Sequence, residues 1–209
     1  MIQILIKGGI LIIPIIACSI IAIAIIIERT YILIKIRKKS KKFLSILKTI
    51  IENEDYAQAT AFCEEENFIV SSIWKEGIEK IIKKKKDFKE TMEDKSSALV
   101  SYLEERLNTL ATIAHVSPLL GLLGTVTGMI KAFMKVEQLA GRADAAALAG
   151  GIWEALVTTA AGLVVAILAM VAHHYLVDKV NNTIKEIEEH SCKLVFLIND
   201  KNDFSGNLL

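Results

Sequence analysis

The sequence predicts an all-α integral membrane protein with three transmembrane helices and long helices that extend into the cytoplasm. Of its 209 residues, 53% are hydrophobic although 23% are charged. Apolar and charged residues must therefore be segregated along the chain rather than mixed through one soluble core. The apolar residues gather in three windows, each near the roughly 19 residues that a helix needs to cross about 30 Å of hydrocarbon.

The first window runs from about Gly8 to Ile27, so residues 1–27 are assigned to an external amino terminus and the first span. Its apolar run is longer than that of a typical secretory signal and its basic flank is the lone Lys7, which predicts an uncleaved anchor. The second span is placed at 111–130 and the third at 155–177. All three are expected to be helices, because unpaired backbone amides facing lipid cost several kcal/mol each.

Positive charge sets the expected orientation. Between the first two spans, residues 28–110 hold 17 Lys and Arg, and the tail 178–209 holds 4. The amino terminus and the loop 131–154 hold only 1 and 3. Because basic loops stay in the cytoplasm, the amino terminus is predicted to lie outside and the carboxyl terminus inside.

The cytoplasmic parts are predicted to be helical. Residues Asp55 to Glu66 place alanines among acids, and apolar residues recur at helical spacing from Asp87 onward with no Pro or Gly before Pro118. One continuous rod is therefore expected to run into the second span. The tail continues as a helix and is expected to fray from Asn199. The run Lys83 to Lys86 is expected to mark a solvated turn or helix end.

Composition argues against several classes of function. A formal net charge of +1 gives no global field for a polyanion, so nucleic acid is not an expected partner. The cysteines at positions 18, 63 and 192 are scattered and odd in number, which argues against a disulfide framework and a zinc site. All three are expected to be reduced packing residues. No metal, cofactor or enzymatic activity is predicted.

Two spans carry faces of small residues. A narrow helical arc of the second span holds Ser117, Gly121, Thr125, Gly128 and Ala132. A similar stripe of the third span holds Thr159, Gly162, Ala166 and Met170. Small residues permit close approach of helix backbones in lipid, and hydroxyls bond across an interface or line a wet path.

Two interpretations of these faces stay open. In the first, both are packing seams, and Thr125, Thr158 and Thr159 donate to backbone carbonyls one turn earlier. In the second, the threonines face an ion path. Threonine does not titrate in the physiological range, so it orients water without carrying a proton, and the second interpretation needs a titratable group from elsewhere.

Glu154 is an acid that directly precedes the third span. An acid at mid-membrane costs about 2.5 to 3.5 kcal/mol and is a functional candidate, although a carboxylate at a helix start also lies favourably at the positive end of the dipole. Glu154 and Thr159 are five residues apart, about 140° around a straight helix. We therefore expect Thr159 to face the path, and Glu154 with Thr158 to lie at the mouth or an interface.

Two segments carry a family resemblance. SPLLGLLGTVTGMI at 117–130 and EALVTTAAGLVVAI at 154–167 resemble the TolQ/ExbB branch of the MotA/TolQ/ExbB proton-channel family. Three spans, a large cytoplasmic insertion and a short external loop extend the resemblance over nearly the whole chain. In two places the sequence departs from the family pattern: Leu168 stands where many members have proline, and His173 and His174 stand where an aromatic residue and asparagine are frequent.

The resemblance implies a proton-motive-force-driven motor in the bacterial inner membrane. Five copies would form a ring around the single-span helices of a TolR- or ExbD-like partner that carries a protonatable aspartate, and the motor would energise an envelope-spanning TonB- or TolA-like effector. Thr125 and Thr159 match the family's pore-facing threonines, and Glu154 matches its acid at the head of the third span. Close helix packing is assigned to Gly121, Gly124, Gly128 and Gly162.

Two alternatives compete with the motor. A passive membrane scaffold would use both faces only for packing, so that exchanging Thr for Val would be harmless and Gly121→Leu would break assembly. A metal-dependent enzyme would need His115, His173 and His174 as ligands, but no acid or cysteine completes such a set.

Overall fold

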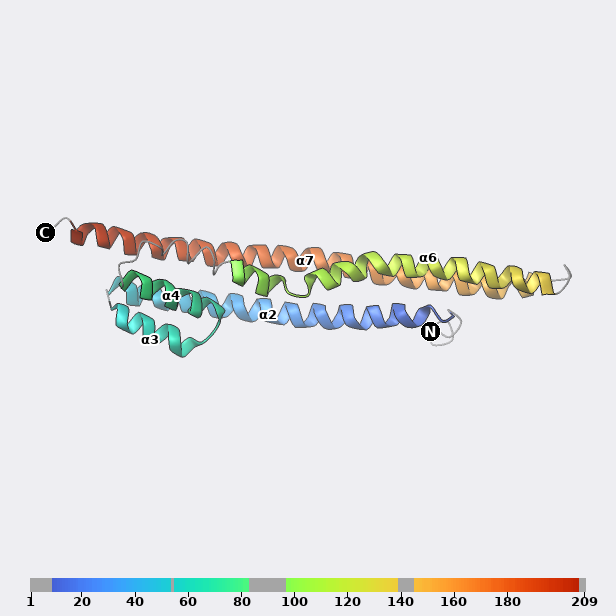
Figure 1. Ribbon diagram of the computed structural model, residues 1–209, viewed down its shortest axis with the longest axis horizontal. Coiled ribbons are helices and arrows are strands. Elements are labelled where there is room, and N and C mark those ends of the chain that lie inside the picture. The colour runs from blue at the N-terminus through green and yellow to red at the C-terminus, as the bar shows by residue number, and fades with distance from the viewer. Residues whose placement is uncertain (1–8, 54, 83–96, 139–144, 207–209) are drawn as a thin grey trace. The chain divides into compact units, whose positions relative to one another are not determined.

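The computed structural model describes residues 9–53, 55–82, 97–138 and 145–206, and no strand occurs among them. Its helices are α2 (Ile12–Glu52), α3 (Tyr56–Glu66), α4 (Ile69–Ile82), α6 (Leu107–Gln138) and α7 (Ala145–Gly206) (Figure 1). Within this described part, α2, α6 and α7 each contain a stretch long and apolar enough to cross a membrane. The chain is therefore an all-α integral membrane protein with three spans.

The chain divides into two compact units. Unit 1 comprises Met1–Arg29 and Arg106–Leu176, and unit 2 comprises Thr30–Glu105 and Val177–Leu209. Unit 1 thus holds the apolar beginning of α2, all of α6 and the first half of α7. The charged parts of α2 and α7 belong to unit 2, together with α3 and α4.

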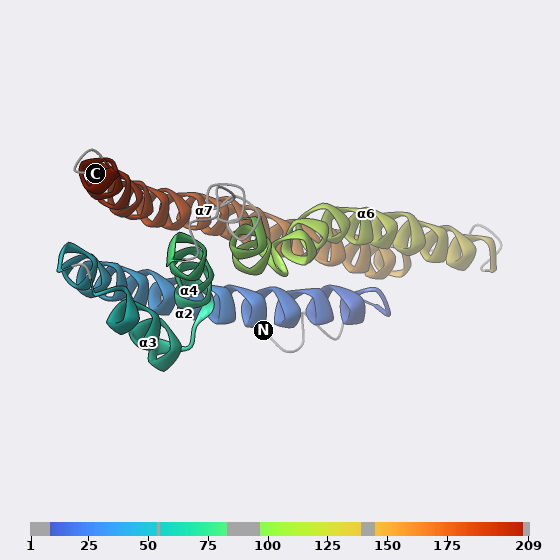
Figure 2. The same ribbon diagram turned by 60° about the vertical axis from the view of Figure 1, so that its left-hand side comes forward.

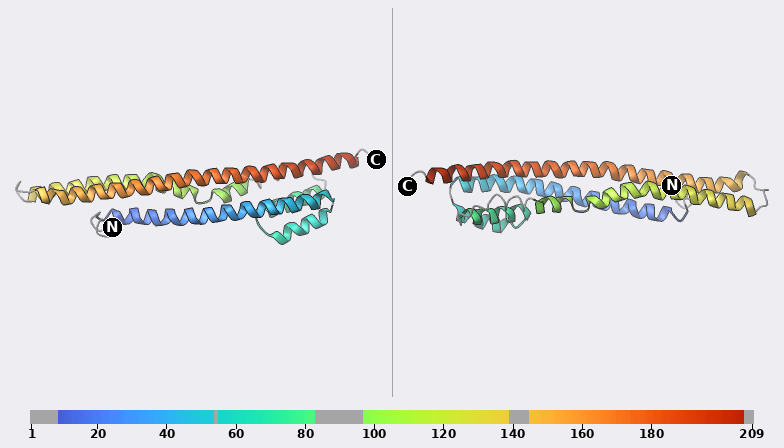
Figure 3. Two further views of the ribbon diagram at one scale, coloured as in Figure 1. Left: turned by 180° about the vertical axis from the view of Figure 1, so that it is seen from behind. Right: turned by 45° about the horizontal axis from the view of Figure 1, so that its top comes forward.

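In unit 1, α6 lies alongside the first half of α7 and runs antiparallel to it (Figures 1 and 3). The face of α6 that is buried near its middle consists of small residues: Ser117, Gly121, Gly124, Gly128 and Ala132. Pro118 is accommodated inside the helix. Small residues at such an interface let two backbones approach closely, which is the main source of helix association in lipid.

Unit 2 is built on an aromatic core, with α3 and α4 beside α2 (Figure 2). The ring of Phe43 from α2 stacks on Phe62 with the centroids 5.3 Å apart, and meets the edge of Phe68 at the same separation. Trp74 of α4 is fully buried. Asp55 caps the start of α3 by accepting a 2.8 Å hydrogen bond from the Gln58 amide. These contacts bury the apolar faces of two short helices that would be marginal alone.

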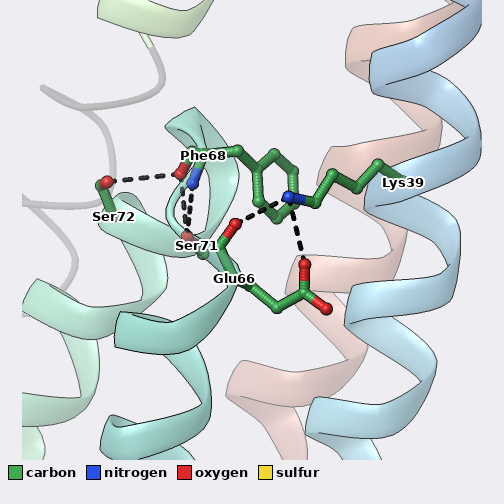
Figure 4. Close-up of polar contacts among 5 residues, drawn as sticks. All are labelled: Lys39, Glu66, Phe68, Ser71 and Ser72. Carbon is green, nitrogen blue, oxygen red and sulfur yellow. Dashed lines mark hydrogen bonds and ion pairs between the residues drawn. The ribbon is translucent and has the colours of Figure 1, made fainter.

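A lysine of α2 closes the turn between α3 and α4 (Figure 4). Lys39 donates to the Glu66 carbonyl at 2.6 Å, pairs with the Glu66 carboxylate at 3.1 Å and lies 4.5 Å from the centroid of the Phe68 ring. Asn67 ends α3 in the left-handed conformation, with φ of 33°, as is common for Asn at this position. Ser71 caps α4, because its hydroxyl accepts from the Phe68 amide at 3.0 Å.

Several sequence predictions can be compared with the helices. The helix expected at 55–66 is confirmed as α3 with its Asp55 cap. The continuous rod into the second span is wrong: residues 97–104 are helical, a turn follows at 105–106, and Arg106 has φ of 64°. Arg106 pairs with the Glu28 carboxylate at 2.6 Å, a contact that helical periodicity could not reveal.

The remaining differences concern the ends of helices. The expected fraying from Asn199 is wrong, since α7 continues to Gly206. Both α6 and α7 continue into the expected external loop, to Gln138 and from Ala145. No break occurs in α7 at Leu168. The lysine run 83–86 and the predicted helix start at 87–96 lie outside the described residues.

The cysteines differ in their surroundings. All three have free thiols. Cys63 is buried, as expected for a packing residue, and Cys18 is half-buried. The prediction is wrong for Cys192, which is exposed, because its position on α7 leaves it on the outer side of the helix within unit 2.

Candidate functional site

The candidate site lies where α6 and α7 meet in unit 1. We call this the α6–α7 seam; it comprises Ser117, Gly121, Gly124, Gly128 and Ala132 of α6 with Gly151, Ala155, Thr158, Thr159 and Gly162 of α7. The four glycines predicted for close packing, at positions 121, 124, 128 and 162, all lie in it. Each of these four glycines has little space for a side chain.

Added methyl groups would meet the opposite helix at these glycines. A Cβ on Gly121 would lie 3.0 Å from the Thr159 Cα, and one on Gly124 would lie 2.5 Å from the Thr158 methyl carbon. At Gly162 it would lie 2.5 Å from the Ser117 carbonyl oxygen. At Gly121 and Gly162 the nearest atoms belong to the backbone, which cannot move aside as a flexible side chain can, so a side chain there would force the two helices apart.

Gly151 is a member of the seam that sequence reasoning missed. A Cβ there would lie 2.7 Å from the Ala132 Cβ and 2.9 Å from the Gly128 carbonyl oxygen. Its neighbour Gly150 has nothing within 4 Å of the corresponding position. The glycine pair was visible in the sequence, but the expected loop at 131–154 hid the fact that one of the two faces a helix.

The three threonines make different hydrogen bonds. Thr125 donates to the Leu122 carbonyl at 2.6 Å and Thr158 donates to the Glu154 carbonyl at 2.6 Å, both within their own helices. Thr159 donates instead to the Gly121 carbonyl on α6 at 2.8 Å. A local bond one turn back was expected for all three under the packing interpretation. The hydrogen bond from Thr159 therefore joins the two helices.

Exposure separates the threonines further. Thr158 is 1% exposed, so its side chain belongs to the interior of the seam. Thr125 and Thr159 are both half-buried. Within this chain, each is therefore a partly accessible residue whose hydroxyl is fixed by a donor bond. An oriented hydroxyl with free lone pairs is able to accept a hydrogen bond from water or from a partner side chain.

The predicted stripe on the third span needs a correction. Met170 is 46% exposed, whereas Ala169 is buried. The residues of α7 that are buried run through Ala155, Thr158, Gly162, Ala166 and Ala169. Thr159 lies at the margin of this buried stripe, because the 3.6-residue period rotates the contact line away from a strict four-residue spacing.

Glu154 has an ionic partner that the sequence did not indicate. Lys131 of α6 donates to its carboxylate at 2.5 Å. The Glu154 side chain is 21% exposed and that of Lys131 is 54% exposed. The two residues come level because the seam pairs Gly128 of α6 with Gly151 and Ala155 of α7. Glu154 thus lies between helices at one end of the seam.

The histidines do not form a metal site in this geometry. His115 and His174 place their Nδ1 atoms 2.7 and 2.9 Å from the Ala111 and Met170 carbonyls of their own helices. The rings of His173 and His174 meet edge to face at 5.6 Å. Among the residues that the structure describes, no group of three or more His, Cys, Asp or Glu could hold a metal ion. The metal-enzyme alternative finds no support here.

The chain is similar in sequence to known proteins over most of its length. The model of the MotA/TolQ/ExbB proton channel family matches residues 65–189, a range that includes all of α6 and the whole seam. A protein named ExbB-like 3 from Synechocystis sp. is 32% identical over 165 residues, which cover 78% of this chain and 78% of that protein.

Shorter matches include proteins named TolQ and ExbB. The Tol-Pal system protein TolQ of Haemophilus influenzae is 46% identical over 82 residues, which are 39% of this chain and 36% of that protein. The biopolymer transport protein ExbB of Neisseria gonorrhoeae is 47% identical over 70 residues, 34% of this chain and 31% of that protein. The three-span chain with its α6–α7 seam therefore belongs to the MotA/TolQ/ExbB proton channel family, in the TolQ/ExbB branch.

Proposed function

We propose that this protein is a subunit of an inner-membrane motor that uses the proton-motive force to energise an envelope-spanning effector. The chain would form a ring of five copies around the single-span helices of a TolR- or ExbD-like partner, with a TonB- or TolA-like effector. Its amino terminus would lie outside and its carboxyl terminus in the cytoplasm. Thr125 and Thr159 would face the proton path.

The observation that carries this proposal is the hydrogen bond from Thr159 to the Gly121 carbonyl. It fixes the hydroxyl of a half-buried residue within the α6–α7 seam, inside the region that the family model matches. A hydroxyl already held in one orientation can accept a hydrogen bond from a proton-carrying group of another chain without first reorganising. Thr125, also half-buried and held by its own helix, would serve beside it.

The proton carrier is expected on another chain. The spans at 8–27, 111–130 and 155–177 contain no Asp or Glu, and threonine does not titrate in the physiological range. Glu154 lies at one end of the seam in an ion pair with Lys131. We therefore expect a deep carboxylate, one of the groups that serve in membrane proton relays, to come from a partner helix.

The energy available suits a mechanical step. One elementary charge that crosses 100 mV releases about 2.3 kcal/mol, against a thermal energy of about 0.6 kcal/mol. A rigid seam is needed to turn this energy into movement of whole helices rather than local deformation. The backbone contacts at Gly121 and Gly162 supply such rigidity, because close-packed interfaces resist continuous deformation.

Affinity purification of the tagged full-length chain from its native membrane in mild detergent tests the assembly. The expected result is a complex with several copies of this chain and a single-span protein that carries an aspartate within its span. Native mass spectrometry gives both stoichiometries. Recovery of the chain with no such protein, under conditions that preserve its own oligomer, would contradict the proposed assembly.

A passive scaffold is the second candidate, and the tight glycine seam favours it as much as it favours a motor. The two differ at the hydroxyls. For a scaffold, Thr159→Val and Thr125→Val leave the assembled complex and its output unchanged, whereas Gly121→Leu breaks assembly. For a motor, both valine variants assemble and lose the output that depends on the proton gradient.

A further inference from the structure

We infer that Lys131 is a positioning residue for the Glu154 carboxylate, and that the backbone turn at Gly9 closes over this carboxylate from the side of α2. The inference rests on the proposed function, because it gives the acid at the head of the third span a fixed place beside the proton path. Three segments of unit 1 meet there: the turn before α2, α6 at Lys131 and α7 at Glu154. We call the three residues Gly9, Lys131 and Glu154 the Glu154 clasp.

The first contact of the Glu154 clasp is ionic. The Lys131 ammonium lies 2.5 Å from a Glu154 carboxylate oxygen, across a separation of 23 residues in the sequence. The lysine is the more exposed partner, so its stem reaches over the helix surface towards the more buried acid. Such a pair restricts the direction of the acid, because Glu154 lies inside α7 and an unpaired carboxylate on a helix surface turns towards water.

The second contact is steric and comes from Gly9. Its φ is +67°, a left-handed conformation that residues with a side chain rarely adopt. Its carbonyl accepts from the Ile12 amide at 3.3 Å, which turns the chain into α2. A Cβ on Gly9 would overlap with the Glu154 Oε1 atom and lie 2.7 Å from Cδ. The conformation therefore favours glycine here, and an added methyl would displace the Glu154 carboxylate.

The remaining bonds of Glu154 extend the arrangement into the seam. Its backbone carbonyl accepts from the Thr158 hydroxyl at 2.6 Å, and the Thr158 methyl lies against Gly124. The side chain of Glu154 is thus tied to α6 through Lys131, and its backbone carbonyl is bonded within α7 by a threonine that packs on α6. A change in Lys131 should therefore alter the place of the carboxylate without opening the seam, which the glycines hold.

Replacement of Lys131 in the assembled complex tests the functional part. Lys131→Gln should lower proton-driven output about two- to fivefold, the range that a partly exposed ion pair supplies. Lys131→Arg should retain it, and the exchange of charges in Lys131→Glu with Glu154→Lys should recover more than half of the loss. Lys135→Gln, an exposed lysine one turn further along α6, is the matched control and should change nothing.

Solid-state NMR of the full chain in lipid bilayers tests the geometry without any transport. Dipolar recoupling between 15N at Lys131 Nζ and 13C at Glu154 Cδ should detect a contact shorter than about 4 Å, the outer limit of an ion pair. Gly9→Ala should shift the Glu154 13Cδ resonance, because the added methyl displaces the carboxylate. Gly150→Ala, which meets nothing within 4 Å, should leave that resonance in place.

The outcomes separate the inference from the proposed function. Absence of the Lys131–Glu154 contact in the bilayer would overturn the inference whatever the transport assay gives. Equal output in Lys131→Gln and the parent complex would also overturn it. If the parent complex shows no proton-driven output while the contact is present and responds to Gly9→Ala, the proposed function fails and the clasp is retained as a structural contact.

Discussion

The hydroxyl of Thr159 donates a 2.8 Å hydrogen bond to the carbonyl of Gly121, from α7 to α6. A side chain on Gly121 would collide with the backbone at Thr159, where a Cβ would lie 3.0 Å from Cα. The bond and the close approach therefore depend on one another. The glycine allows the threonine to reach the opposite helix, and the threonine satisfies its donor without turning back on its own helix.

We expect Thr159→Val to abolish proton-driven output while the complex still assembles. Valine is nearly isosteric, so it keeps the packing and removes the hydroxyl; the lost hydrogen bond costs about 1 kcal/mol of stability. Output in cells or vesicles energised by a proton gradient is the measurement, with size-exclusion chromatography as the test of assembly. Thr127→Val is a matched control, because Thr127 bonds only within α6, to the Leu123 and Gly124 carbonyls.

Adjacent glycines on α7 should respond in opposite ways to alanine. Gly151→Ala introduces a methyl that would lie 2.7 Å from the Ala132 Cβ and 2.9 Å from the Gly128 carbonyl oxygen, and should destabilise the chain by about 1 to 3 kcal/mol. Gly150→Ala meets nothing and should stabilise it by about 0.5 to 1 kcal/mol through helix propensity. Unfolding in detergent micelles measures both. Equal effects at the two positions would contradict the seam.

Cys63 and Cys192 should differ sharply in thiol reactivity. Burial raises the pKa of Cys63 to about 12, an effect that the nearby Lys75 ammonium partly opposes. Because the thiolate is the nucleophile, Cys63 should resist a maleimide reagent at pH 8 until unit 2 unfolds. Cys192 is exposed and should react at once. Mass spectrometry of the labelled Cys18→Ala variant counts the sites, and rapid double labelling of the folded protein would show the core of unit 2 to be open.

Unit 2 should lose a contact between α2 and α7 in acid. Glu186 accepts hydrogen bonds from Arg37, one of 2.7 Å from Nε, and this bonding lowers the pKa of the carboxyl, as do the charges of Arg37, Lys41 and His190, while desolvation opposes the shift. A lowered folded-state pKa gives stability that is present above the unfolded value of about 4.3 and is lost as the pH falls through the folded value.

Thermal unfolding of the parent and Glu186→Gln chains between pH 7 and pH 3 checks this sign. The parent should be the more stable at pH 7, and the difference should shrink below about pH 4, where the carboxylate becomes protonated. The effect is expected to be small, because the Glu186 side chain is 40% exposed. Glu188→Gln, an exposed acid on the same helix, is the control. A difference that grows in acid would contradict the pairing.

Much of the fold follows from the sequence alone. The length of an apolar run is enough to locate a span, because a single segment in lipid can satisfy its own backbone hydrogen bonds only as a helix. Asp55 marks the start of α3, because its side chain has a local partner in the Gln58 amide. The glycines of the seam other than Gly151 could also be anticipated, since in lipid a row of small residues is useful mainly against another backbone.

What could not be predicted depends on pairs that are distant in sequence. The break at Arg106 accompanies an ion pair with Glu28. Lys131 likewise pairs with Glu154 on another helix. The partner of Thr159 was equally hidden, because the choice between its own helix and Gly121 depends on the rotation of α7 against α6. Helical periodicity gives a face but not the neighbour of that face.

The most direct test of the motor is proton entry into vesicles. The complex of this chain with the single-span protein that co-purifies with it is reconstituted with a pH-sensitive dye inside, and an inward proton gradient with a membrane potential is imposed. The parent complex should acidify the interior, and the Thr159→Val complex, at equal protein content and equal oligomer size, should acidify it at the rate of empty vesicles. Equal proton entry through both complexes, or none through the parent, would contradict a proton path at Thr159.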